Sequence, residues 1–301
     1  MAGIIIEGAD GSGKTTLIRH LLHYLQWPVC HVVQPGVPNI EQMAWLAQSG
    51  PMIFDRFHWS PVVYGEVLRR GPELDGHDWW MLEGLLLARG YVTVLCVTEI
   101  DEMLRNNENE VQLWDSVREY QVVYDLAVEY SRLQDASKLP TLTYNYRCQT
   151  PEQIVPWLNE HVRNPAPVGI LGSPRPAVWL VGDRRSCSDI YTEHLPFYTS
   201  RHFANRTKGL STAGLYLNCA MDMVGLTWDK VALSNSCGYD LSYMYSDLGR
   251  PKVIALGQAA SNRLKKSGIE HSRVPHPQYY RRFYHRQVAD YGRLIAEEIV
   301  R

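Results

Sequence analysis

Apolar and polar positions along the first 163 residues follow two periods in turn. Short apolar runs of the strand type are separated by segments in which apolar residues recur every three to four positions. The predicted strands are 3–7, 28–33, 51–54, 91–97 and 141–146, and the predicted helices are 14–25, 61–70 with Ser60 as its cap, 78–89, 112–134 and 151–162. This alternation predicts a parallel sheet covered by helices on both faces.

The rest of the chain shows the same alternation without repeating the first half. Between the two stands NPAPVGILGSPRP, residues 164–176, whose four prolines and two glycines indicate a linker. The predicted strands beyond it are 177–181, 231–234 and 252–256, and the predicted helices are 211–224, 258–267 and 278–300. We therefore expect two α/β domains, at 1–163 and 177–301.

Composition narrows the class of protein. Hydrophobic residues make up 45% of the chain and charged residues 21%, which is typical of globular domains. No apolar run reaches the roughly 18 residues of a membrane helix, and the N-terminus lacks the basic region of a signal peptide. The six cysteines never occur as CxxC, which favours free thiols over disulfides or a metal site. We expect a cytoplasmic protein with no membrane partner, in the host cytoplasm if the chain is viral.

The net charge of −2 hides an asymmetry between the halves. Residues 1–163 hold 12 Lys/Arg and 21 Asp/Glu, whereas residues 164–301 hold 18 and 11. A basic surface concentrates polyanions whatever fold lies beneath it, so the second half is a candidate for binding nucleic acid. Chance distribution over two solvated surfaces is the alternative.

A glycine-rich segment follows the first predicted strand and leads directly into the helix at 14–25. It fits G-x-x-x-x-G-K-[ST], in the strand–loop–helix context that a phosphate-binding loop needs. Glycines let backbone N–H groups converge on phosphate oxygens, the lysine reaches the β- and γ-phosphates, and the threonine hydroxyl can bind magnesium. The segment predicts a site for ATP and Mg²⁺. Its residues are Gly8, Ala9, Asp10, Gly11, Ser12, Gly13, Lys14 and Thr15.

An acid–arginine pair, Asp55-Arg56, ends the third predicted strand, where ligands bind in sheets of this kind. The acid can take a proton from an attacking hydroxyl or hold a magnesium-bound water, and the arginine can bind a phosphate or the acceptor. We predict that Asp55, Arg56 and Lys14 are catalytic and that Thr15 and Asp55 hold the metal. An ordinary ion pair is the alternative for Asp55 and Arg56.

Residues 52–70 resemble the thymidylate kinase and deoxynucleoside kinase family, in which an acid–arginine pair is followed by an aromatic residue and Ser-x-x-x-Tyr, here Phe57, Ser60 and Tyr64. The segment 110–132, with Arg118 and Tyr124, resembles the helix after the lid of that family. The resemblance covers 1–163 and implies a P-loop kinase domain with a parallel sheet. The chain departs from the family at 101–115, which holds one arginine among several acids. A lid that closes on a free nucleotide brings several cations, so this departure argues against a nucleoside monophosphate as acceptor.

Four segments of the second half, in order, resemble the uracil-DNA glycosylase superfamily: 178–186, 206–236, 252–264 and 274–280. The resemblance implies a second α/β domain of that type. Asp183 could activate water and His276 could stabilise a departing base, or both are polar residues on a binding surface. The loop after Gly182 lacks the proline–glycine of the superfamily, and the cysteines lack iron–sulphur spacing. We therefore favour a domain that reads DNA over one that cleaves glycosidic bonds.

Cations and tyrosines interleave near the end of the chain, where tyrosines 279, 280 and 284 alternate with arginines. Aromatic rings stack on bases and cations bind phosphates, so the pattern is typical of a nucleic-acid surface, with a solvated basic helix as the alternative. The predicted DNA-binding residues are Arg184, Arg185, His276, Arg281 and Arg282.

With both resemblances in one chain, the sequence is similar to bacteriophage DNA kinases of the thymidylate kinase family. They imply ATP-dependent phosphorylation of the hydroxymethyl group of 5-hydroxymethyl-deoxyuridine in DNA, a step in phage thymidine hypermodification. The partner would then be DNA that contains modified thymidine or uracil bases, and Asp55 would orient or deprotonate the hydroxymethyl oxygen. Three alternatives remain open: a free deoxynucleoside monophosphate kinase with an accessory domain, an ATP-switched DNA-binding module, and a bifunctional protein with glycosylase activity.

Overall fold

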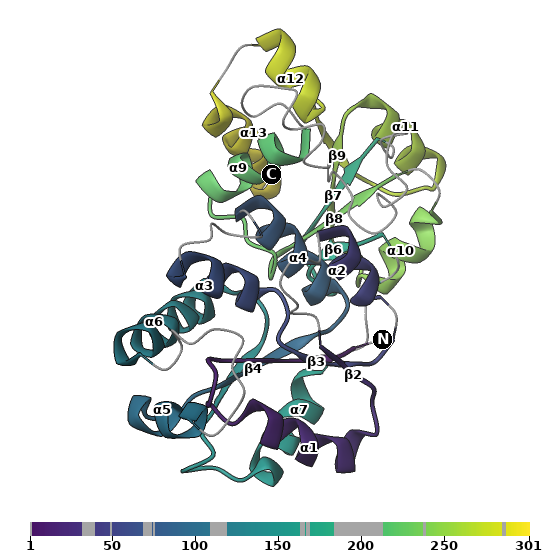
Figure 1. Ribbon diagram of the computed structural model, residues 1–301. Coiled ribbons are helices and arrows are strands. Elements are labelled where there is room, and N and C mark those ends of the chain that lie inside the picture. Colours follow the sequence, from purple (N-terminus) through teal and green to yellow (C-terminus); the bar gives the residue numbers. More distant parts are fainter. Residues whose placement is uncertain are drawn as a thin grey trace. The chain divides into compact units, whose positions relative to one another are not determined.

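The computed structural model describes residues 2–31, 40–48, 50–68, 74, 76–108, 119–162, 166, 169–183, 213–236, 239–284 and 287–301. The chain divides into two compact units (Figure 1). The first unit is Met1–Leu82 with Arg89–Asn164, and the second is Glu83–Ala88 with Pro165–Arg301. No helix in the described part of the chain is long and apolar enough to cross a membrane.

A five-stranded sheet forms the centre of the first unit, with the order β2-β3-β1-β4-β5. Neighbouring strands pair in parallel throughout this order, which confirms the expected parallel sheet. The strands are β1 (Ile4–Glu7), β2 (Val29–His31), β3 (Ile53–Asp55), β4 (Val92–Cys96) and β5 (Thr141–Tyr144). Because helices cover both faces, β1, β3 and β4 are buried along their whole length.

The helices of the first unit pack on the sheet through two apolar clusters. They are α1 (Lys14–Leu25), α2 (Ile40–Leu46), α3 (Trp59–Val67), the first part of α4 (Gly76–Ala88), α5 (Ile100–Glu108), α6 (Tyr120–Ala136) and α7 (Pro151–His161). Val94 packs in one cluster with Leu17 of α1 and Leu158 of α7, whereas the next residue, Leu95, packs in the other with Leu126 of α6. Successive side chains of β4 therefore pack on opposite faces of the sheet.

The second unit contains a mixed sheet in the order β10-β9-β7-β8-β6, in which only β6 runs antiparallel. Its strands are β6 (Leu171–Gly172), β7 (Val178–Gly182), β8 (Val231–Asn235), β9 (Lys252–Leu256) and β10 (Ser272–Val274). The range 164–176, which we expected to be a linker, thus contributes a strand. Ile170 and Leu171 are fully buried, because an apolar pair beside a sheet gains more from joining the core than from spanning solvent.

Five helices of the described residues complete the second unit. They are α9 (Ala213–Met223), α10 (Leu241–Asp247), α11 (Gln258–Lys266), α12 (Pro277–Tyr284) and α13 (Val288–Val300). The single helix expected at 278–300 was wrong, because Gln287 has an extended conformation and begins a new helix. The core of the unit includes Trp179, Val181 and Ala255.

Helix α4 is divided between the units, because Glu83–Ala88 belong to the second. A side chain at Gly84 would place its Cβ 2.6 Å from the indole ring of Trp228, so the helix backbone and this ring are in close contact. The carbonyl oxygen of Ala88 accepts a hydrogen bond of 2.7 Å from the backbone N–H of Ala166. The second unit is therefore discontinuous in sequence, which differs from the two consecutive domains, 1–163 and 177–301, that we expected.

Candidate phosphate-binding and transfer site

The loop between β1 and α1 depends on glycine at three positions. Gly8, Gly11 and Gly13 have φ angles of 141°, 75° and 90°, values that other residues rarely adopt. A Cβ at Gly8 would lie 2.4 Å from the carbonyl oxygen of Cys96, and one at Gly13 would lie 2.7 Å from the ring of Tyr146. The loop thus leads into the amino end of α1 with its backbone closely packed, and that end of a helix favours anions.

Lys14 is buried at the first position of α1. Its ammonium donates to the carbonyl oxygens of Gly8, at 2.8 Å, and Ala9, at 2.6 Å. Burial and the neighbouring charge of Arg56 lower the pKa of Lys14 to about 8, although Asp10 and Asp55 oppose them. The loop therefore holds a cation that is already desolvated and surrounded by acceptors.

Helix α5 holds the same loop from outside. The side-chain amide of Asn106 donates to the carbonyl oxygen of Gly11 at 2.8 Å and to the hydroxyl of Tyr146 at 3.2 Å. Asn107, on the same helix, is fully buried. Sequence reasoning placed this segment in a polar lid and did not identify either asparagine. A pair of amides directly after an amphipathic stretch was the available signal.

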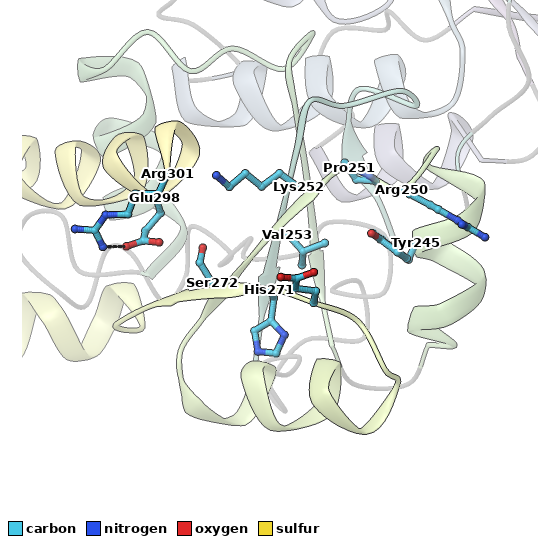
Figure 2. A pocket seen from close by; sticks show the side chains of 10 residues that line it. Tyr245, Arg250, Pro251, Lys252, Val253, His271, Ser272, Glu298 and Arg301 are labelled. Carbon is cyan, nitrogen blue, oxygen red and sulfur yellow. Dashed lines mark hydrogen bonds and ion pairs between the residues drawn. The ribbon is translucent and has the colours of Figure 1, made fainter.

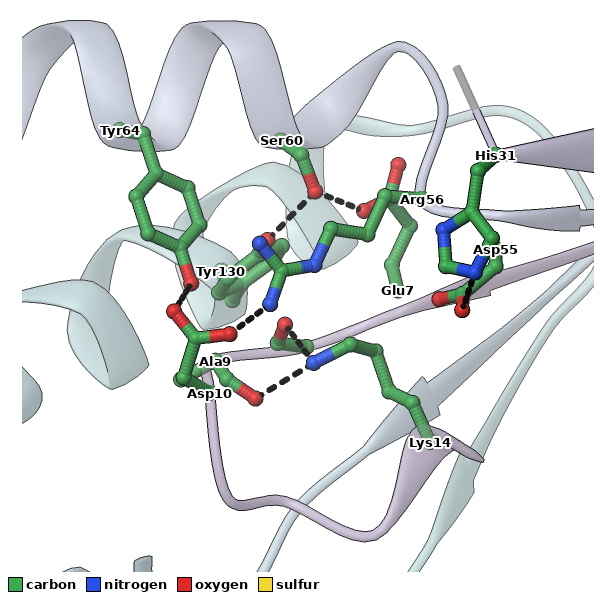
Figure 3. Close-up of polar contacts among 11 residues, drawn as sticks. Glu7, Ala9, Asp10, Lys14, His31, Asp55, Arg56, Ser60, Tyr64 and Tyr130 are labelled. Atoms are coloured by element: carbon green, nitrogen blue, oxygen red, sulfur yellow. Dashed lines mark hydrogen bonds and ion pairs between the residues drawn. The ribbon is translucent and has the colours of Figure 1, made fainter. Parts of the chain in front are cut away.

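Three polar side chains meet beside the loop (Figure 3). Arg56 donates to one carboxylate oxygen of Asp10, and the hydroxyl of Tyr64 donates to the other at 2.8 Å. Burial raises the pKa of Asp10, but Arg56 and Lys14 outweigh it and lower that pKa overall. The Arg56 guanidinium also lies 5.1 Å from the centre of the Tyr64 ring. Asp10, a residue of the glycine-rich loop, thus holds the side chain of Arg56, which follows β3.

Arg56 reaches this position through an unusual backbone. Its φ angle is 65°, in the left-handed region, and its N–H donates to the carbonyl oxygen of Ile6 at 2.9 Å. That region costs a non-glycine residue about 1–2 kcal/mol, which the surrounding contacts must offset. Such strain concentrates at functional sites, where it directs a side chain that a regular strand would point elsewhere.

Asp55, the last residue of β3, is buried, and its carboxylate oxygen Oδ2 lies 2.9 Å from His31 Nε2. It also lies near enough to Lys14 to raise the pKa of that lysine. Thr15 has an exposed side chain one residue after Lys14. The structure therefore brings Lys14, Asp55 and Arg56 together with the glycine-rich loop.

Glu7 is a buried acid that sequence reasoning missed. One carboxylate oxygen accepts from the backbone N–H of Phe57 at 2.9 Å and of Trp59 at 3.0 Å, and the other accepts from the Ser60 hydroxyl at 2.6 Å. Ser60 in turn lies 2.7 Å from the hydroxyl of Tyr130. The carboxylate thus satisfies the amino end of α3. An acid that ends the apolar run IIIE was the signal.

The expected cap of α3 was consequently wrong. Ser60 lies inside the helix, which begins at Trp59, and its hydroxyl donates to Glu7 instead of accepting from the helix backbone. The reason is that a carboxylate from β1, more than 50 residues earlier, already occupies that end of the helix. Of the two residues expected after the lid, Tyr124 lies half-exposed on α6 and Arg118 lies outside the described residues.

In the second unit, Asp183 and His276 follow the carboxyl ends of β7 and β10. A Cβ at Gly257 would lie 3.0 Å from Asp183 Oδ1 and 3.2 Å from His276 Cβ, so both residues flank this glycine. Asp183 Oδ1 accepts from the backbone N–H of Ala260 at 2.8 Å, near the start of α11. Burial lowers the pKa of His276, although Asp183 opposes it. One oxygen of Asp183 thus stabilises a helix end, which is a structural use for this acid.

The other predicted DNA-binding residues are less completely placed. Arg281 is half-buried on α12, whereas the side chain of Arg282 and the whole of Arg184 and Arg185 lie outside the described residues. Tyr280, which we expected to stack on bases, is buried and packs 5.0 Å from Tyr291, between ring centres. Tyr280 therefore belongs to the core of this unit.

A pocket of about 470 Å³ lies at the amino ends of the strands of this sheet, whereas Asp183 and His276 follow the carboxyl ends (Figure 2). Lys252 and Ser272, at the amino ends of β9 and β10, are among its lining residues. His271 uses both ring nitrogens, towards Ile269 O and Ser261 Oγ, each at 2.8 Å. Arg301 donates to Glu298 at 2.7 Å, and Lys252 donates to the carbonyl oxygen of Ile299 at 3.0 Å, so these charged groups of the pocket already have partners.

Cys30, Cys96, Cys148 and Cys219 are free thiols, whereas Cys187 and Cys237 lie outside the described residues. Within the described part of the chain, no group of three or more His, Cys, Asp or Glu side chains could hold a metal ion.

No protein-family model matches the chain, and no curated protein matches it significantly in sequence. Several solved structures are similar to about half of it. YorR from Bacillus subtilis, in complex with phosphorylated GDP, is 18% identical with a TM-score of 0.46, over 54% of this chain and 99% of that one. Deoxyadenosine kinase from M. mycoides with bound dATP is 15% identical with a TM-score of 0.37, over 52% and 97%. Polyphosphate kinase 2 from Arthrobacter aurescens TC1 is 13% identical with a TM-score of 0.35, over 47% and 60%.

Proposed function

We propose that this chain is an ATP-dependent kinase that phosphorylates the hydroxymethyl group of 5-hydroxymethyl-deoxyuridine in DNA. The observation that carries the kinase assignment is the convergence of Lys14, Asp55 and Arg56 at the glycine-rich loop. Phosphoryl transfer needs little covalent chemistry from a protein and depends on cations around the phosphates and a residue that orients the nucleophile. The three side chains supply these elements within one unit.

The loop and the start of α1 would hold the phosphates of ATP. Backbone N–H groups and the positive end of the helix favour the anion, and Lys14 would exchange its carbonyl acceptors for phosphate oxygens. The Thr15 hydroxyl and the Asp55 carboxylate are oxygen donors, which suits Mg²⁺, an ion that takes few protein ligands beside phosphates. When bound, Mg²⁺ would neutralise part of the charge of the phosphates.

The acceptor side rests on Asp55 and Arg56. Asp55 would orient the acceptor hydroxyl and take its proton, while Arg56 would bind the acceptor or the transferred phosphoryl group. Arg56 is held in place by Asp10 and Tyr64, so little side-chain entropy is lost when it binds an anion. The side chain of Arg56 would therefore be preorganised for binding an anion.

A polymer acceptor is supported by the charge around the loop. In the described part of the expected lid, Arg105 is already paired with Glu102 at 2.6 Å. The described part of this segment, 101–108, therefore offers little positive charge to the phosphate of a free monophosphate. DNA can instead be held by the second half of the chain, which carries 18 Lys/Arg against 11 Asp/Glu. Taking the modified base out of the duplex costs a few kcal/mol, which phosphate contacts can offset.

The test offers γ-³²P-labelled ATP and Mg²⁺ to the whole chain with three acceptors. These are a duplex with one 5-hydroxymethyluracil, the same duplex with thymine, and thymidine monophosphate. We expect label only on the modified strand, and none with Lys14→Met. Label on thymidine monophosphate would replace the proposal with a free-nucleotide kinase, and no label on any acceptor would overturn the transferase assignment. The whole chain is used because the second unit includes Glu83–Ala88.

A further inference from the structure

A histidine that no sequence pattern indicated lies beside Asp55. Strands β2 and β3 are parallel neighbours, and their register makes His31 the Cα partner of Asp55. Partner residues of adjacent strands extend from the same face of a sheet, so the two side chains meet. His31 Nε2 lies 2.9 Å from Asp55 Oδ2 (Figure 3). The contact therefore follows from the register of β2 on β3.

The two side chains differ strongly in burial. The Asp55 side chain is 6% exposed, whereas that of His31 is 74% exposed. A buried carboxylate is costly unless it accepts hydrogen bonds, and the imidazole provides one. Nε2 donates both in the neutral tautomer that carries its hydrogen there and in the cation, so the contact does not depend on charge. The exposed imidazole of His31 thus supplies a hydrogen bond to the buried carboxylate of Asp55.

The contact also distinguishes the two carboxylate oxygens of Asp55. The ion pair with His31 uses Oδ2 of Asp55. Oδ1 takes no part in this ion pair, and we assign it to a reacting hydroxyl or to Mg²⁺. A carboxylate with one fixed oxygen cannot rotate freely, and fixed orientation lowers the barrier of a transfer reaction.

We propose that His31 is a positioning residue that fixes the carboxylate of Asp55 for phosphoryl transfer. The inference rests on the phosphoryl-transfer step of the proposed function and does not depend on which acceptor, water included, receives the phosphoryl group. In Figure 3 the dashed line from His31 leads to Asp55. His31 would therefore act on the reaction through that carboxylate. Removing it should lower turnover while leaving nucleotide binding intact.

The experiment compares variants of the whole chain. His31→Leu removes the donor and His31→Gln keeps an amide donor at a similar reach. His23→Gln, at an exposed histidine on α1, is the matched control. We expect His31→Leu to lower kcat about tenfold or more, the scale found when the partner of a functional group is lost. His31→Gln should recover most of that loss, and His23→Gln should match the wild type.

Two further measurements separate positioning from a general structural effect. MgATP affinity, measured by calorimetry, and KM for ATP should stay at wild-type values in His31→Leu, because a positioning defect acts on the transfer step. The double variant His31→Leu/Asp55→Asn should lose no more turnover than Asp55→Asn alone, because both changes disable one unit. Unchanged kcat in His31→Leu, or losses that multiply in the double variant, would overturn the inference.

The choice of acceptor keeps this result distinct from that of the proposed function. Turnover is measured with whichever acceptor the wild type labels, and with water as acceptor if it labels none. Label on thymidine monophosphate would overturn the DNA substrate while the His31 variants still decide the positioning role. A wild type that neither labels an acceptor nor hydrolyses ATP would overturn both.

Discussion

The ammonium of Lys14 donates to the carbonyl oxygen of Ala9 at 2.6 Å, inside the same loop that the lysine ends. Carbonyl oxygens of the loop therefore bind the Lys14 ammonium in the protein without nucleotide. A bound nucleotide would replace these carbonyl acceptors by charged phosphate oxygens, which form stronger hydrogen bonds with an ammonium. The difference between the two kinds of acceptor would supply part of the binding free energy.

Lys14→Met should abolish phosphoryl transfer and leave the fold in place. Methionine fills a similar volume but carries no charge, so the cradle loses its cation while the packing of α1 is kept. Turnover and circular dichroism are measured on the same preparation. Near-wild-type turnover with an unchanged spectrum would contradict the assignment of the nucleotide site.

ATP binding should weaken as the pH rises above about 8. Burial and Arg56 lower the pKa of Lys14 to about 8, so the free protein loses this proton at higher pH. Phosphate oxygens favour the ammonium, so binding above that pH takes up a proton and affinity falls. Calorimetry in buffers of different ionisation enthalpy measures the uptake. Lys14→Met should show neither the uptake nor this pH dependence; the same uptake in that variant would assign it to another group.

Asp55→Asn should retain ATP binding and lose turnover by about 10²-fold or more, the scale expected when a positioned base is removed. Asparagine keeps the size of the side chain and can still accept a hydrogen bond from His31. Rapid-quench kinetics separate transfer from product release. A loss below about tenfold would reduce Asp55 to a structural contact.

Glu7→Ala should lower the free energy of unfolding by about 3 kcal/mol or more, because it leaves buried donors of Phe57, Trp59 and Ser60 without their acceptor. Glu7→Gln keeps one carbonyl acceptor and should cost less. Urea denaturation at constant pH measures both. Equal costs for the two variants would show that charge, and not hydrogen bonding, stabilises the start of α3.

Charge reversal at Arg281 and Arg282 should weaken DNA binding and flatten its salt dependence. Each DNA phosphate that the protein no longer neutralises should change the slope of log affinity against log salt by about 0.9. ATP affinity should be unchanged, because the glycine-rich loop belongs to the first unit. Lys138→Glu, an exposed position after α6, is the control. An unchanged slope would remove these arginines from the DNA surface.

The sequence revealed elements whose signal is local. The apolar run at Ile4–Ile6 and the period of Lys14–Leu25 are sufficient by themselves, and both elements were predicted nearly to the residue. Helix α5 was missed because one of its two buried residues is Asn107, a polar side chain that the helical period does not reveal. β6 and β10, of two and three residues, are too short to show a strand pattern.

The site divides in the same way. Lys14, Asp55 and Arg56 stand out because each belongs to a compact sequence pattern, and the structure brings them together. Glu7 and His31 do not, because their partners lie on other strands and helices. Only the register of β2 on β3 and the reach of β1 towards α3 reveal them. The arginines at 184 and 185 stay a prediction.

The division of α4 has a consequence for how this chain is made and inherited. Residues 83–88 leave the ribosome about 80 residues before the stretch that begins at Pro165, so part of one core waits for its remainder during synthesis. A gene fragment cut at codon 164 would encode one unit with a surplus helical turn and another with a gap beside Trp228. Recombination at that point would therefore not exchange the units cleanly.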